Sequence, residues 1–382
     1  MFSQHYQYFD SRIRKILDNI KTPSLERIDE ILLKARSEEL TFEEIAELLE
    51  IGKSPQPFKQ FEQMRIFTYN YFRKETNELR HISPVYLSSF CVDTCGYCQF
   101  SAKRKDTPRT RLSISQLEEE LAKGVFPLGS RIIEFTLATD PHFTSTELTR
   151  YVKRTKELLA DQKGSGVLLC SDHMTKEAYK ELKEAGLWGM VQWDETLDKD
   201  NYKRWHSNSP RKSDMTTRMD NHDRAMSQGL EVATGVLFGL SDYRYDVLMQ
   251  IAKTRYLQIE YGRKPFVFGT PRLKPIGGIV LHPNTEVDDC KYETALMTYK
   301  IAEPSIGRWL QTRESPELNL RNILDQDVYT YKCGEVKPGG YLVNASVING
   351  VKGAQFKVVE LEKDWFEKKL EGMNFELNYA WI

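Results

Sequence analysis

The stretch Pro84-Val-Tyr-Leu-Ser-Ser-Phe-Cys-Val-Asp-Thr-Cys-Gly-Tyr-Cys-Gln-Phe100 joins two different kinds of sequence. Its first six residues, 84–89, are a short apolar run that predicts a buried β-strand. The remainder puts Cys91, Cys95 and Cys98 on one compact loop directly after that strand. Chemistry-bearing side chains just after a strand are typical of the C-terminal mouth of a parallel β-barrel.

Seven further apolar runs follow along the chain, separated by longer helical patterns. They are 131–137, 165–170, 187–193, 230–237, 265–270, 306–311 and 326–332. Eight strands that alternate with helices predict an α/β fold, a (β/α)8 barrel of the TIM type. Helix starts are predicted at a capping box over 115–118 and at Thr175, with Gly186 near the end of the second helix.

The chain before this stretch has a different spacing of apolar residues. Apolar residues recur at helical spacing, and Thr41 with Glu44 indicates a capped helix. We therefore expect three parts: an N-terminal helical extension over 1–80, the barrel over 81–335, and a C-terminal segment over 336–382 that packs on the barrel.

Composition excludes several classes of protein. The 382 residues carry a formal net charge of −1, and no basic excess points to nucleic acid. A secretory N-terminus and a long apolar span are both lacking, so we expect a cytoplasmic protein away from membranes. Of the six cysteines, Cys170, Cys290 and Cys333 are scattered, a pattern that does not suggest a disulfide scaffold.

Three thiolates at positions i, i+4 and i+7 suit an iron–sulfur cluster. A loop this short can wrap one [4Fe–4S] cubane and bind three of its irons, which leaves the fourth iron open to the amino and carboxylate groups of S-adenosylmethionine. One alternative is a zinc site completed by His81 or His142, although zinc prefers four ligands and no fourth stands nearby. Another is three cysteines packed in the core.

The spacing C-x3-C-x2-C, with Tyr97 before the last cysteine, resembles the radical S-adenosylmethionine superfamily. Several later segments are similar to its aromatic amino acid lyases, which comprise 2-iminoacetate synthase of thiamine biosynthesis, the tyrosine lyase of hydrogenase maturation and tryptophan lyase. These segments are Glu195-Thr196, Gly235-Val-Leu-Phe-Gly-Leu-Ser-Asp242, Pro271-Arg-Leu-Lys-Pro275, Thr312-Arg-Glu-Ser-Pro316 and Pro338-Gly-Gly-Tyr341.

The resemblance implies roles around S-adenosylmethionine. Tyr97 would lie near the adenine, and Glu195, with Asp194 as the other candidate, would accept the ribose hydroxyls. Arg218 would grip the carboxylate, a role for which Arg224 competes.

Two positions bear on the substrate and the amino group of the cofactor. Arg313 is implied to bind the carboxylate of an amino acid substrate, with Arg272 as the alternative. Similar lyases carry Gly-Glu where this chain has Ala138 followed by Thr139 and Asp140, so either of these last two would have to replace the glutamate that holds the amino group. His206 and His222 lie in a charged stretch and are expected to be solvated.

The implied activity is cleavage of the Cα–Cβ bond of a free aromatic amino acid by a 5′-deoxyadenosyl radical. L-Tyrosine would give dehydroglycine and p-cresol. A reductant such as flavodoxin or ferredoxin is expected, and a downstream biosynthetic protein such as a thiazole synthase is implied. Two alternatives stay open: a related radical enzyme of cofactor biosynthesis that acts on another small substrate, as biotin synthase does, and an iron–sulfur carrier or structural metal protein.

Overall fold

A single sheet of parallel strands organises the chain. The computed structural model describes residues 1–53, 59–105, 107–160, 162–274, 285–331, 340–342, 355–356, 359 and 361–382. The strands in these residues are β1 (Asn77–Arg80), β2 (Ser83–Ser88), β3 (Ile132–Leu137), β4 (Gly166–Cys170), β5 (Gly189–Trp193), β6 (Glu231–Gly235), β7 (Val267–Gly269), β8 (Gly307–Leu310), β9 (Asp327–Tyr329) and β10 (Phe375–Asn378). Their order is β10-β1-β9-β8-β7-β6-β5-β4-β3-β2.

Helices follow or precede most of these strands. They are α1 (Tyr6–Asn19), α2 (Leu25–Lys34), α3 (Phe42–Glu50), α4 (Lys59–Phe72), α5 (Ile114–Glu119), α6 (Ser145–Leu159), α7 (Lys176–Glu184), α8 (Lys199–His206), α9 (Met215–Met219), α10 (Asn221–Met226), α11 (Tyr243–Tyr261), α12 (Asp289–Ala302), α13 (Pro316–Asn322) and α14 (Lys363–Glu371). No helix in the described part of the chain has the length and apolar content needed to span a membrane.

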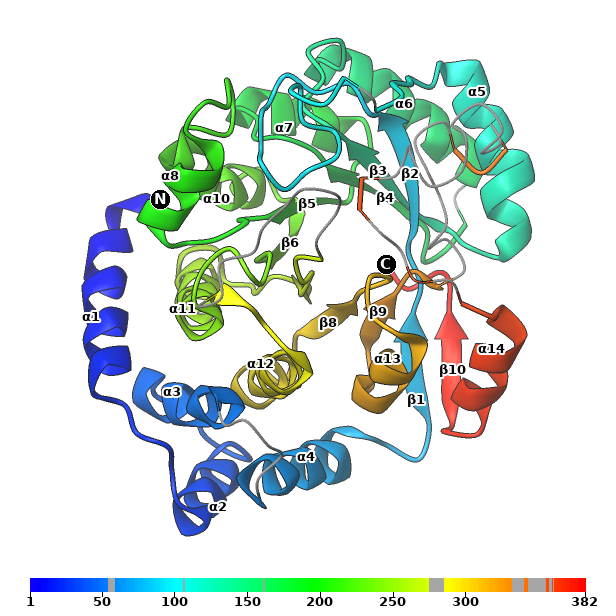
Figure 1. The fold of residues 1–382 in the computed structure, drawn as a ribbon. Helices are drawn as coiled ribbons and strands as arrows, with labels where there is room; N and C mark the ends of the chain where they lie inside the picture. The colour runs from blue at the N-terminus through cyan, green and yellow to red at the C-terminus, as the bar shows by residue number, and fades with distance from the viewer. Residues whose placement is uncertain are drawn as a thin grey trace.

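The sheet curls into a TIM-like half-barrel whose end strands are β10 and β2 (Figure 1). Alternate residues of its strands form a packed inner layer that includes Ile132, Leu168, Val191, Val267 and Val328. All eight predicted strands are present as β2 to β9, and the expected α/β barrel class is confirmed. The two remaining strands were not predicted: β1 pairs with both β9 and β10, so one end of the sheet is built from the N-terminal and C-terminal segments together.

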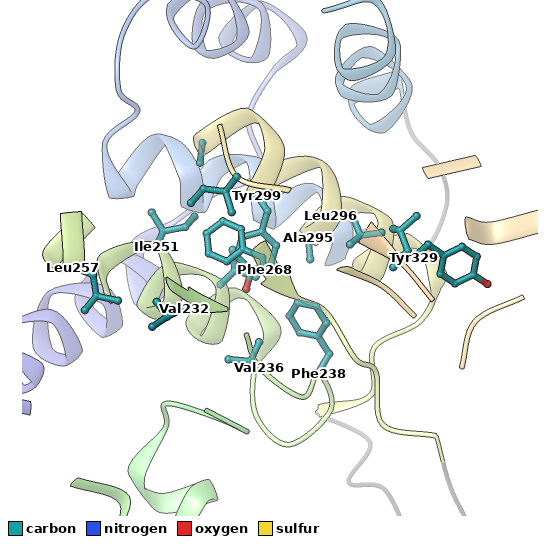
Figure 2. Close-up of a cluster of buried hydrophobic side chains, with 14 of the residues drawn as sticks. Val232, Val236, Phe238, Ile251, Leu257, Phe268, Ala295, Leu296, Tyr299 and Tyr329 are labelled. Carbon is teal, nitrogen blue, oxygen red and sulfur yellow. The ribbon is translucent and has the colours of Figure 1, made fainter. Parts of the chain in front are cut away.

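The outer face of the sheet packs on helices. Phe268 of β7 points away from the barrel and stacks on Tyr299 of α12 with ring centroids 4.4 Å apart (Figure 2). Because α1 and α3 in turn pack on α11, and α3 and α4 on α12, the N-terminal helices share one hydrophobic core with the barrel. Parallel sheets are commonly covered on their outer face in this way.

Local signals placed most helix ends correctly. The Thr41–Glu44 capping box and the Thr175 cap are both present, and Gly186 takes a positive φ of 101° just after α7. The capping box predicted at Ser115 was wrong by two residues: α5 is capped by Ser113, whose side chain pairs with the backbone of Gln116. Cys333 and the predicted boundary at 335/336 lie outside the described residues.

Candidate functional site

One pocket opens at the C-terminal mouth of the barrel. Cys91, Cys95 and Cys98 line it, and they stand on the loop that leaves β2. Two contacts tie this loop to its neighbours. The amide of Val92 donates to the carbonyl oxygen of Thr139 over 3.0 Å. The Asp93 carboxylate accepts hydrogen bonds from the amides of residues 211 and 212, at 2.9 and 3.1 Å.

Arg109 holds the second half of the cysteine loop. Its guanidinium donates to the carbonyl oxygens of Ser89, Phe100, Ser101 and Arg104 at distances of 2.6–3.1 Å. Four hydrogen bonds from one planar cation fix the backbone on both sides of the cysteines. The loop is therefore shaped by the protein itself, as a site for a preformed cluster requires.

The thiols of Cys91 and Cys95 are protonated when they bind nothing. Burial raises the pKa of Cys95 to about 12 and raises that of Cys91 as well. Binding iron would displace these protons. Neither His81 nor His142 lines the pocket that the cysteines line, so the histidines considered as a fourth zinc ligand lie elsewhere. Within the described ranges no three His, Cys, Asp or Glu side chains converge closely enough to hold a single metal ion.

Tyr97 is held in one orientation by His206. Burial, together with the charge of Lys212, lowers the pKa of His206 to about 4, so its ring is neutral. The Nδ1 atom lies 2.8 Å from the carbonyl oxygen of Tyr202 and must donate to it, which leaves Nε2 to accept from the Tyr97 hydroxyl at 2.8 Å. The prediction that His206 is solvated was wrong, because this side chain is buried under the cysteine loop.

Glu195 occupies a charged corner of the same pocket. Lys212 donates to its carboxylate over 2.6 Å, and Arg218 lies 3.5 Å away. Burial alone would raise the pKa of Glu195, but these two cations hold it at about 2. The backbone of Glu195 takes a positive φ of 66°, a strained conformation for a non-glycine residue that is common at functional sites.

Arg218 also lines the pocket and keeps one donor free. Its other nitrogens bond Asp172 and the carbonyl oxygen of Trp193, whereas the buried Nε atom has no hydrogen-bond partner among the described residues. Arg224, the competing arginine, does not line this pocket, because it bonds the carbonyl oxygens of Met174 and Thr217.

Arg313 enters the pocket from the loop after β8. Its guanidinium carbon lies 3.7 Å from the ring centroid of Phe356, and its buried Nε atom has no hydrogen-bond partner in the described part of the chain. Trp193 and Trp309 line the same pocket and meet edge to face with ring centroids 5.7 Å apart. The pocket thus combines a cation that has an unused donor with an aromatic wall.

Three candidate residues do not reach the pocket, because other side chains engage them. Asp194 accepts from Lys253 at 2.9 Å inside the barrel wall. Asp140 is held by Arg111 at 2.6 and 2.9 Å and by Ser88, so Thr139 faces the pocket in its place. Arg272 pairs with Glu314 and lies over the ring of Tyr292.

Comparisons with known proteins agree with this geometry. Residues 85–254 match the model of the radical SAM superfamily. The 2-iminoacetate synthase of Escherichia coli (strain K12) is 28% identical over 270 residues, which is 70% of each chain. Over these residues the chain is similar to the radical SAM superfamily. Enzymes of this superfamily use a [4Fe–4S] cluster and S-adenosylmethionine, and the pocket of this chain offers three thiols and unpaired arginine donors that suit those two groups.

Solved structures resemble the whole fold. The [FeFe]-hydrogenase maturase HydG superposes with a TM-score of 0.83 at 24% identity, and the match covers 97% of this chain and 80% of HydG. Methylornithine synthase (PylB) gives a TM-score of 0.67 at 17% identity over 92% of this chain and 97% of PylB. At these identities the likeness establishes that the chain shares their fold.

Sequence reasoning missed three residues of this pocket. Lys212 bridges the cysteine loop and Glu195, Asp172 pairs with Arg218, and His206 orients Tyr97. Each of the three makes at least one contact with a residue 46 or more positions away in the sequence. No spacing signal in a single sequence marks such partners.

Proposed function

We propose that the chain is a radical S-adenosylmethionine lyase that cleaves the Cα–Cβ bond of a free aromatic amino acid, with L-tyrosine giving dehydroglycine and p-cresol. One observation carries the proposal: the three cysteines and Arg313 face a single pocket. The relation to a protein named 2-iminoacetate synthase supports the same class of reaction.

The three cysteines would hold the cluster, and four side chains would hold S-adenosylmethionine beside it. The unpaired Nε of Arg218 suits the methionyl carboxylate, Glu195 suits the ribose hydroxyls, Tyr97 the adenine and Thr139 the amino group. The cluster and S-adenosylmethionine, when bound, supply a 5′-deoxyadenosyl radical. Asp194 and Asp140 would support these residues from behind, each through its own cation.

Arg313 would fix the substrate. Burial lowers the pKa of its guanidinium, but arginine stays charged at neutral pH, and a carboxylate can satisfy its free donor. The indoles of Trp193 and Trp309 would pack against the aromatic ring and keep water from the reacting atoms. Arg272 would act indirectly, since its pairing with Glu314 steadies the residue that follows Arg313.

A second candidate keeps the radical chemistry and changes the substrate. The observation that favours it is the engagement of Asp140 by Arg111 and Ser88, which puts a neutral hydroxyl, Thr139, where related lyases carry a glutamate. An enzyme of cofactor biosynthesis with a different small substrate would share every other feature. In both cases the reductant is a flavodoxin or ferredoxin, and the setting is the cytoplasm.

Anaerobic turnover tests the proposal. The protein is reconstituted with iron and sulfide, reduced, and incubated with S-adenosylmethionine and L-tyrosine, and p-cresol and 5′-deoxyadenosine are measured. Cys95→Ser removes a ligand, whereas Cys290→Ser on α12 is the matched control, because Cys290 lies outside the pocket.

Each outcome separates the candidates. The lyase is supported if the wild type and Cys290→Ser form p-cresol and Cys95→Ser does not. Deoxyadenosine without p-cresol rejects tyrosine as substrate and favours the second candidate. A bound cluster that never cleaves S-adenosylmethionine indicates an iron–sulfur carrier.

A further inference from the structure

Glu134 places a carboxyl group inside the barrel. It lies on β3 two residues after Ile132, and both side chains point inward, because alternate residues of a strand share a face. The side chain is 6% exposed and lines the pocket that also contains the cysteines and Arg313. It therefore sits deep in the pocket, below the level at which β3 ends.

No cation in the described part of the chain pairs with this carboxyl group. Its neighbours among the described residues are the Cys170 thiol of β4 and the Thr136 hydroxyl, with the Tyr86 phenol of β2 facing the same space. Burial raises the pKa of Glu134 to about 8, so the group is mostly protonated at neutral pH. It can then donate one hydrogen bond and accept another.

Other buried carboxylates near the mouth of the barrel have a cation as their partner. Three of them bind a cation directly: Glu195 pairs with Lys212, Asp194 with Lys253, and Glu314 with Arg272. Burying a polar group without a partner costs free energy, so such groups are normally paired inside the protein. Glu134 lacks such a pair and points into an open pocket, which is the arrangement expected of a group that meets a ligand.

Part of the pocket wall is aromatic and closely packed. Gly269 of β7 leaves room for the Trp193 indole, since a Cβ atom there would lie 2.2 Å from the indole ring. Trp193 and Trp309 thus offer flat apolar surfaces, while Glu134 offers one polar contact. A ligand that matches this wall is an aromatic ring with a single polar substituent.

Glu134, Arg313 and Tyr86 line one and the same pocket. The charges of Glu134 and Arg313 both act on the pKa of the Tyr86 phenol, so both groups lie near this side chain. We propose that Glu134 is the specificity-determining residue that hydrogen-bonds the phenol hydroxyl of a tyrosine whose carboxylate is held by Arg313. This inference rests on the proposed lyase function and names its substrate class, a para-hydroxylated aromatic amino acid.

Phenylalanine is the discriminating probe. It fills the same aromatic space but leaves the buried Glu134 carboxyl without a partner, and sites built to bond a substrate hydroxyl reject the analogue that lacks it. We expect the wild type to bind L-tyrosine at least about tenfold more tightly than L-phenylalanine. Glutamine at position 134 retains a hydrogen-bonding group of the same shape, whereas leucine removes it.

The test is equilibrium binding without turnover. Full-length protein carrying its cluster and S-adenosylmethionine, kept oxidised, is titrated with each amino acid by calorimetry. E134Q should keep the preference for tyrosine, and E134L should reduce it to less than about threefold, with iron content and S-adenosylmethionine affinity unchanged. A merely structural role for Glu134 would alter stability without altering this ratio.

Each result decides a different question. The inference is overturned if the wild type binds both amino acids equally, or if an E134L protein that retains its iron keeps the full preference. If E134L does not fold, equal binding of both amino acids by the wild type still overturns the inference. If p-cresol forms and the preference is absent, only the role of Glu134 fails; if the wild type neither binds tyrosine nor releases p-cresol, the proposed function fails with it.

Discussion

Replacing Glu134 by glutamine should change how stability depends on pH. Burial raises the pKa of this carboxyl from 4.5 to about 8, so between these values the folded protein holds a proton that the unfolded chain has lost. The free energy of unfolding therefore falls as pH rises, by about 1.36 kcal/mol per pH unit. From about pH 5.5 to about pH 7.5 the wild type should lose roughly 2 to 3 kcal/mol that E134Q, which has no titrating group there, retains.

Guanidinium unfolding under anaerobic conditions measures this effect. Both proteins are unfolded at both pH values, and the change in the wild type is compared with the change in E134Q, so that the titration of shared histidines cancels. The gap, meaning the free energy of unfolding of E134Q minus that of the wild type, should rise by roughly 2 to 3 kcal/mol from about pH 5.5 to about pH 7.5. If the gap is the same at both pH values, the carboxyl group is not held protonated by burial, and the account of its environment is refuted.

The remaining predictions concern the cluster, the substrate and the barrel wall. Cys95→Ser should lose the brown colour and the bound iron, whereas Cys290→Ser should keep both; equal iron in the two variants would contradict the assigned ligand. Arg313→Met should raise the KM for tyrosine by about tenfold or more while deoxyadenosine still forms in the absence of substrate, and an unchanged KM would remove its role as substrate anchor. Asp194→Ala strands the fully buried Lys253 ammonium and should lower the free energy of unfolding by about 3 to 5 kcal/mol in denaturant titrations. Weakened S-adenosylmethionine binding at unchanged stability would instead restore the direct role for Asp194.

Strands could be predicted well because their signal is local. Runs such as 165–170 and 187–193 correspond to β4 and β5 within two residues, since a strand buried on both faces is apolar at successive positions. The missed strands, β1 and β10, read Asn77-Glu-Leu-Arg80 and Phe375-Glu-Leu-Asn378. They are short and half polar, and only their pairing with each other and with β9 makes them strands.

Candidate site residues could be named from sequence, but the side they face could not. Asp194 and Glu195 are adjacent, yet one turns to Lys253 in the wall and the other to the pocket. The same holds for Thr139 and Asp140, because Arg111 arrives from a distant loop to hold the aspartate. His222 was expected in solvent and is fully buried, with Nε2 near the carbonyl oxygens of Gln192 and Ala233.

The amino-acid sequence by itself determined the cysteine loop, the order of eight strands and the kind of chemistry, because covalent spacing brings Cys91, Cys95 and Cys98 together whatever surrounds them. Only the tertiary structure decided which acidic residues and arginines form internal ion pairs, and which arginines keep an unpaired donor in the pocket. The physical reason is that burial is costly for charge, and the partner that offsets this cost, as Lys253 does for Asp194, comes from a part of the chain that only folding brings near.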